Sequence, residues 1–185
     1  MELRLVGSEM CIRDRVIVGY FIYTSGLIEN LRNLKVIAWT TLVFGILLFI
    51  ADRSSIKNRF DTSLNLKNIL LIGIFQILAV IPGVSRSGII ITASRFLNFD
   101  RVDSSKISFY LSIPALAGAS ILSLKDVMNA NIDLNILFLY SIIFSFMVSY
   151  LTIKYFLIYV KNFNLNIFVY YRTFLALILF VIAYS

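Results

Sequence analysis

Long apolar stretches alternate with short polar gaps along most of this chain. A helix needs about 20 apolar residues to cross the roughly 30 Å hydrocarbon core of a bilayer. The sequence offers candidates of about that length at 36–51, 107–124, 134–153 and 167–185. A shorter run, 16–28, has the character of the end of a further helix. The pattern therefore predicts an all-α, polytopic membrane helix bundle.

Two apolar runs in the middle of the chain are too short to cross a bilayer. As helices, 68–81 and 88–99 would measure about 21 Å and about 18 Å. The sequence PGVSRSG joins them, with Pro82 and two glycines that favour a tight, non-helical connection. We therefore expect one re-entrant helix hairpin whose tip lies near the middle of the membrane. Irregular backbone at that depth is tolerated when protein buries it or when it lines a wet cavity.

The distribution of basic residues supports this hairpin. If 68–99 enters the membrane and returns, the segments 52–67, 100–106 and 154–166 lie on one side. That side then carries most of the basic residues outside the chain's start: Arg53, Lys57, Arg59, Lys67, Arg95, Arg101, Lys106, Lys154 and Lys161. The other side carries Arg32, Lys35 and Lys125. The positive-inside rule then assigns the basic side to the cytoplasm.

Composition agrees with a membrane protein. Hydrophobic residues make up 59% of the chain and charged residues 15%, whereas soluble domains carry about 45–50% and about 25%. The net charge of +7 comes from residues in short gaps that form no basic face, so we expect no nucleic-acid partner. Cys11 is the single cysteine and there is no histidine, which excludes a disulfide framework and a histidine base.

Residues 1–15 differ from the rest of the chain. MELRLVGSEMCIRDR is polar and aperiodic, and it lacks the apolar core of a signal peptide. We expect it to be non-native sequence or a disordered end. Residues 16–185 would then form the membrane domain.

The hairpin connection holds the candidate chemistry. An arginine in mid-membrane is costly, so Arg86 is expected to face a cavity or a partner. Its guanidinium suits the oxygens of a phosphate, and the start of the following helix favours an anion. Ser85 and Ser87 add hydroxyl groups, either of which could act as a nucleophile. A kinked helix in which Arg86 pairs with a carboxylate is the structural alternative.

The motif and its surroundings resemble one known family. PGVSRSG is followed by SFYLSIPALAGA, and YRTFLALILF stands near the end of the chain. In this order the segments resemble the undecaprenyl-diphosphate phosphatase, or bacitracin-resistance, family. The resemblance runs from about residue 16 to the end of the chain.

This resemblance implies a fold and an activity. The family fold is a pair of inverted repeats, each with a re-entrant hairpin, so this chain would form half of it. The activity is hydrolysis of undecaprenyl diphosphate to undecaprenyl phosphate and phosphate in the bacterial inner (plasma) membrane. This step recycles the lipid carrier for cell-wall synthesis and underlies bacitracin resistance. A divalent cation, Mg²⁺ or Ca²⁺, is expected to assist, and a homodimer is left open.

The resemblance also suggests site residues and shows two departures. We expect Ser85, Arg86 and Ser87 to be catalytic and Gly83, Gly88, Thr92 and Arg172 to bind substrate. The family's threonine falls on Ile90, and Thr92 lies about 200° away around a helix. The family's first region, with its ExxxE stretch and PVSSTGH, is absent. We therefore expect a C-terminal fragment that is inactive alone, with the metal ligands outside this chain.

Two alternatives stay open at this stage. Arg172 lies about one turn inside the last apolar stretch, so it could extend to the cytoplasmic interface rather than bind phosphate. Broken helices at the membrane midplane also occur in secondary transporters, where helix ends hold anionic substrates. A transporter or permease with an anion site is therefore the rival function.

Overall fold

The computed structural model describes residues 33–58, 65–129 and 136–184. Within these ranges the elements are α3 (Leu34–Asp52), α5 (Leu66–Ile77), a 3₁₀ turn η1 (Leu78–Val80), α6 (Arg86–Phe96), α7 (Arg101–Asn129), α8 (Ile136–Asn162) and α9 (Asn166–Tyr184). No strand is present in this part of the chain, so the all-α prediction is confirmed. Predictions for 1–15 and 16–28 concern residues outside the described ranges.

Among the described residues, three helices are long and apolar enough to cross a membrane. They are α3, the part of α8 from Phe138 to Asn162, and α9. These helices confirm a polytopic membrane protein and agree with the predicted stretches 36–51, 134–153 and 167–185. The predicted stretch 107–124 lies within α7, which continues unbroken through Pro114.

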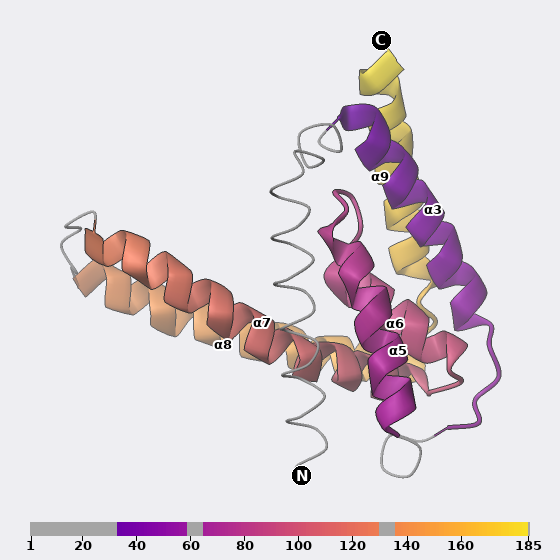
Figure 1. The fold of residues 1–185 in the computed structure, drawn as a ribbon, viewed down its shortest axis with the longest axis horizontal. Coiled ribbons are helices and arrows are strands. Elements are labelled where there is room, and N and C mark those ends of the chain that lie inside the picture. Colours follow the sequence, from indigo (N-terminus) through magenta and orange to yellow (C-terminus); the bar gives the residue numbers. More distant parts are fainter. Residues whose placement is uncertain (1–32, 59–64, 130–135, 185) are drawn as a thin grey trace.

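Helices α3 and α9 lie side by side, and the α5–α6 hairpin packs beside them (Figure 1). One face of α3 carries buried residues at alternating spacings of three and four, and all but Leu48 are small or polar: Ala38, Thr41, Gly45, Leu48 and Asp52. Small residues let membrane helices approach closely and gain van der Waals contact, since lipid tails are as apolar as leucine. This face therefore fixes the position of α9 and of the hairpin.

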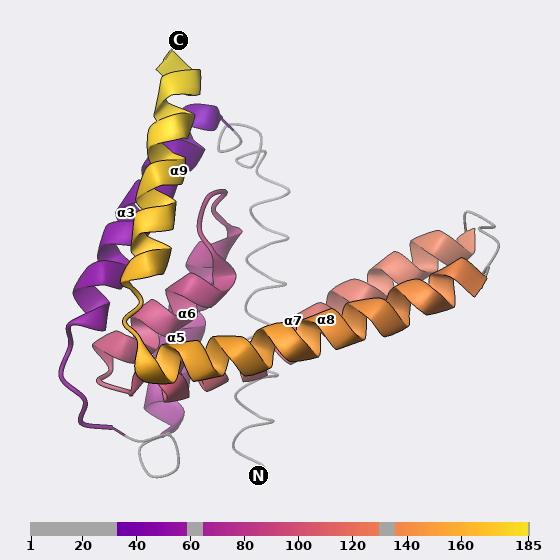
Figure 2. The same cartoon turned by 180° about the vertical axis from the view of Figure 1, so that it is seen from behind.

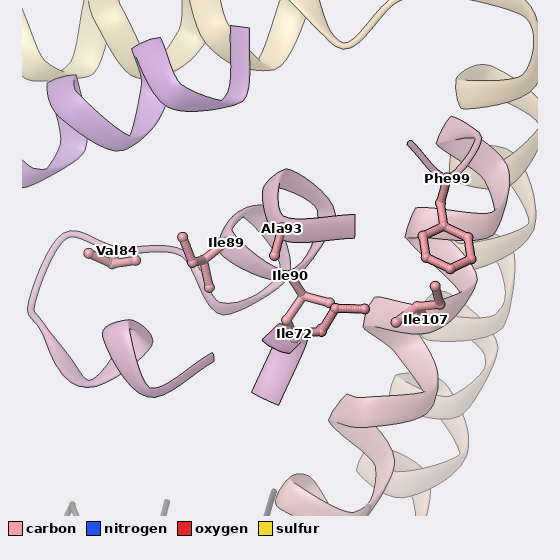
Figure 3. Close-up of a cluster of buried hydrophobic side chains, with 7 residues drawn as sticks. All are labelled: Ile72, Val84, Ile89, Ile90, Ala93, Phe99 and Ile107. Atoms are coloured by element: carbon pink, nitrogen blue, oxygen red, sulfur yellow. The ribbon is translucent and has the colours of Figure 1, made fainter. Parts of the chain in front are cut away.

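The hairpin has a compact apolar interior (Figure 3). Its buried side chains come from both half-helices, the tip, the following turn and the start of α7: Ile72, Val84, Ile89, Ile90, Ala93, Phe99 and Ile107. A second cluster joins α3, α6, α8 and α9 through Leu48, Ile91, Val160, Leu165 and Val169. Helix α6 is thus surrounded by protein on most sides, as a membrane-inserted half-helix next to irregular backbone requires.

Helices α7 and α8 form an antiparallel pair that extends away from the rest of the molecule (Figures 1 and 2). We call the part of α7 after Phe109, together with the part of α8 that lies beside it, the arm. The start of α7 packs against α6, where Ser104, Ser105 and Ser108 are buried. In contrast, no residue of the most apolar window of α8 is buried. The arm therefore presents its apolar side chains outward.

The structure corrects three predicted boundaries. The second half-helix begins at Arg86 rather than at residue 88, because Ser85 caps it and accepts a hydrogen bond from the Gly88 amide at 3.2 Å. The predicted connection 100–106 is instead the first turns of α7, and Ser104 donates its amide to the Asp100 carbonyl at 2.8 Å. The predicted connection 154–166 is helical as far as Asn162.

Candidate functional site

The tip of the hairpin is held against α3 by a glycine and a threonine. Gly83 has φ +90°, a backbone conformation that residues with a side chain rarely adopt. A Cβ at Gly83 would overlap Thr40 and lie 2.8 Å from the Ile37 carbonyl. The Thr40 hydroxyl donates to the Pro82 carbonyl at 2.7 Å, so the irregular backbone has a partner within the protein. Gly83 is therefore placed for close backbone packing of the loop on α3.

The start of α6 presents two serine hydroxyls and a helix N-terminus. The Ser85 and Ser87 hydroxyl oxygens lie 3.2 Å apart, and either can donate to the other. Ser87 is exposed, while Ser85 and Arg86 are half-buried. The unpaired amides of a first helical turn carry partial positive charge, which favours an anion at this point.

Arg172 approaches this helix start from α9. Its Nη2 atom lies 3.2 Å from the point that a Cβ on Gly88 would occupy. Its own Cβ lies 3.5 Å from the corresponding point on Gly45, so the glycine in α3 leaves room for Arg172 to reach inward. The structure thus brings the guanidinium of Arg172 close to the predicted motif, and its contact with a phosphate stays a prediction.

Thr92 lies one turn further along α6 and is turned toward its own helix. Its hydroxyl donates to the Gly88 carbonyl at 2.7 Å, and the residue is 2% exposed. This arrangement keeps the Thr92 side chain away from the exposed helix start. The contact of Thr92 with substrate stays a prediction.

The site is cationic. Within the described ranges, the carboxylates that form ion pairs are Asp52, with Arg95 and Arg101, and Asp103, with Lys106. Arg86 takes part in none of these pairs, so the structural alternative of a carboxylate partner gains no support. The described residues also contain no group of three metal-ligating side chains.

A small cavity lies beside Ser87. It has a volume of about 140 Å³, and its lining includes Ser87, Ser108 and Thr152. The Ser108 hydroxyl is also 3.5 Å from the Ser87 carbonyl. A larger groove of about 760 Å³ between α8 and α9 shares Thr152 and Phe156 with this cavity and is lined mostly by aromatic and aliphatic side chains.

A polar cluster at the opposite end of the hairpin was not predicted as a unit. Arg101 binds both carboxylate oxygens of Asp52, at 2.6 and 3.1 Å, and the Leu165 amide donates to the same carboxylate at 3.3 Å. Arg95 is 2% exposed and donates to the backbone carbonyls of Phe99, Asp52 and Ser54. This cluster, which we call the base clamp, joins α3, α6, α7 and the turn before α9.

The comparison with known proteins agrees with these features. Residues 13–178 match the family described as "Bacitracin resistance protein BacA". The chain is 56% identical over 171 residues to an undecaprenyl-diphosphatase of Pelagibacter ubique, a match that covers 92% of this chain and 67% of the relative. It is 45% identical to an undecaprenyl-diphosphatase of Elusimicrobium minutum and 41% identical to one of Alteromonas mediterranea.

These two matches cover 82% and 89% of this chain, and 57% and 62% of the respective relatives. The chain thus spans about three fifths of the length of these relatives. The family match extends over most of the chain and includes the hairpin and the part of α9 that contains Arg172, which carry the candidate site. The chain belongs to the bacitracin resistance protein BacA family.

Proposed function

We propose that this chain acts in the hydrolysis of undecaprenyl diphosphate to undecaprenyl phosphate and phosphate, as an integral protein of the bacterial inner membrane. The observation that carries the proposal is the cationic hairpin tip, where Arg172 approaches the helix start that bears Ser85, Arg86 and Ser87. The names of the relatives support the same activity. Recycling of the lipid carrier for cell-wall synthesis and bacitracin resistance follow from it.

In this proposal the arginines bind the diphosphate group. Arg86 offers a planar pair of donors to two phosphate oxygens, and Arg172 neutralises further charge beside Gly88. Neutralisation matters because the transferred phosphoryl group and the departing lipid phosphate both carry negative charge in the transition state. The amides at the start of α6 add donors that need no rearrangement during the reaction.

The serine hydroxyls are the candidate nucleophiles. Ser87 is the more exposed of the two, while Ser85 already accepts a hydrogen bond as the helix cap. Attack by a hydroxyl requires a base to remove its proton. We assign no base among the described residues, because the paired carboxylates there are engaged by Arg95, Arg101 and Lys106.

A divalent cation, Mg²⁺ or Ca²⁺, remains part of the proposal, with ligands that are not among the described residues. A homodimer is a further arrangement that would bring a second set of side chains to the tip.

The prenyl chain is assigned to the groove between α8 and α9. This groove meets the cavity beside Ser87 at Thr152 and Phe156, so a lipid whose head lies at the tip could extend along it. Aromatic and aliphatic walls suit an isoprenoid tail, which needs apolar contact and no hydrogen bonds.

The test variant is Arg86→Lys. Its control is Lys154→Arg, which exchanges the same two residue types at an exposed position on α8. Binding of farnesyl diphosphate is measured with the purified chain in detergent micelles. Because this chain is expected to be inactive alone, release of phosphate is measured with the same exchanges in a full-length protein of the family, with a divalent cation. Removing one donor to a developing charge typically costs about 100-fold or more in rate, and we expect that loss together with weaker binding for Arg86→Lys. Wild-type binding and phosphate release by Arg86→Lys would refute the assignment.

A further inference from the structure

A second cavity lies at the base clamp, at the opposite end of the hairpin from the tip. It has a volume of about 570 Å³, which is within the range of small-molecule sites. Its lining includes three arginines and one aspartate: Arg53, Arg95, Arg101 and Asp52. Three guanidinium groups and one carboxylate leave a surplus of two positive charges around this cavity.

The buried part of this charge is fixed in place. The terminal nitrogens of Arg95 donate hydrogen bonds to backbone carbonyls. The Arg95 Nε lies 3.8 Å from a carboxylate oxygen of Asp52 and makes no hydrogen bond. Arg101 donates two hydrogen bonds to Asp52, yet its side chain is still 29% exposed. The carboxylate therefore offsets one of the two cations and leaves the other uncompensated in a protected position.

Arg53 supplies donors at the mouth of the cavity. It is exposed, and its guanidinium carbon lies 4.2 Å from the centre of the Phe49 ring. Stacking on a ring occupies the face of the guanidinium and leaves the N–H groups in its plane free for oxygen atoms. The side-chain amides of Asn164 and Asn166 line the same cavity and can also donate.

The start of α9 adds to the positive potential. Asn166 is the first residue of this 19-residue helix, so the partial positive charge of the helix N-terminus lies at the cavity wall. An anion here would meet guanidinium groups, amides and a helix start together. This combination is suited to the oxygens of a phosphate group.

We infer that the base cavity is a second anion site, separate from the hairpin tip, that binds a phosphate group at the cytoplasmic membrane surface. Basic pockets between membrane helices on that side bind the headgroups of anionic lipids. The positive-inside rule gives this end of the molecule to the cytoplasm. The inference does not depend on the proposed hydrolysis, because none of its residues belongs to the tip.

The test compares lipids and free phosphate as ligands of the purified chain. Thermal unfolding is followed in neutral detergent during titration with dioleoyl phosphatidylglycerol, dioleoyl phosphatidylcholine or inorganic phosphate. The variant is Arg53→Gln, and the matched control is Lys57→Gln, an exposed cation in the same segment that does not line the cavity. We expect phosphatidylglycerol to raise the midpoint in a saturable way and phosphatidylcholine to leave it unchanged.

Loss of one basic residue should weaken phosphatidylglycerol binding about fivefold in Arg53→Gln, with no such loss in Lys57→Gln. Stabilisation by phosphatidylglycerol alone identifies a lipid headgroup as the ligand. Equal, Arg53-dependent stabilisation by inorganic phosphate identifies the free anion. Absence of a saturable shift with either ligand, or equal binding by Arg53→Gln and wild type, would overturn the inference.

Discussion

The hairpin region and the α7–α8 arm differ in the interactions that hold their helices in place. In α3, which packs against the hairpin, 28% of the most apolar window is buried, whereas in α8 none is. The hairpin region combines a positive-φ glycine, buried hydroxyls and the base clamp. The described residues of the arm contain few such features. The exposed apolar side chains of the arm need lipid or another protein surface to cover them.

This contrast shows that apolarity alone gives a membrane helix but does not fix its neighbours. Lipid satisfies the apolar face of α8 as well as a protein partner would. Close backbone approach and buried polar contacts are different, because lipid cannot replace them. We therefore expect substitutions in the hairpin region to cost much more stability than comparable substitutions in or near the arm.

The largest effect is expected for the base clamp. Asp52→Asn would remove the buried carboxylate that Arg101 binds and that lies 3.8 Å from buried Arg95, and breaking a buried ion pair in this way costs about 3–5 kcal/mol. The control is Asp103→Asn, at a residue that is partly buried and pairs at 3.6 Å with the exposed Lys106, and a pair with such access to solvent is worth about 1 kcal/mol or less. Chemical unfolding in mixed micelles measures both. Equal costs for the two variants would show that the clamp does not hold the helices together.

A smaller effect is expected from two glycines. Gly83→Ala places a Cβ against Thr40 at φ +90°, and overpacking of this kind costs about 1–3 kcal/mol. Gly118→Ala in the arm meets no atom within 4 Å and improves helix propensity by up to about 1 kcal/mol. In the same unfolding assay, the free energy of unfolding should therefore fall for Gly83→Ala and rise for Gly118→Ala. Destabilisation by Gly118→Ala would mean that the arm is packed where the structure leaves it open.

The sequence predicted the hairpin because its signals are local. Two short apolar runs and the Pro-Gly pair define its length and turn, and the structure confirms both half-helices. The contact of the linker after α3 with the turn after α6 agrees with the predicted return: the Lys57 and Asn58 amides both donate to the Asn98 carbonyl at 3.0 Å. The sequence left the role of Arg172 open between the cytoplasmic interface and a phosphate contact, and its phosphate contact stays a prediction.

The base clamp could not be predicted from the same pattern. Arg95 was interpreted as one of the charges that orient the protein, yet it is 2% exposed and bonded to backbone carbonyls. Its partner Asp52 is 43 positions away, and one sequence carries no signal for such a distant pair. The start of α7 had a local signal that was missed: Asp100 is followed three residues later by Asp103, a pattern typical of a helix N-terminus.

We propose that the hairpin enters the membrane and returns, so that its base faces the cytoplasm and water reaches its tip from the outer face. Single cysteines at Ser87 in the tip and at Lys57 near the base test it directly, in a Cys11→Ser background. Both positions are exposed, so a membrane-impermeant thiol reagent can reach them from whichever side they face. We predict that intact cells label the cysteine at position 87 and that position 57 reacts only after the membrane is opened. Labelling of position 57 from outside, with position 87 protected, would contradict the account.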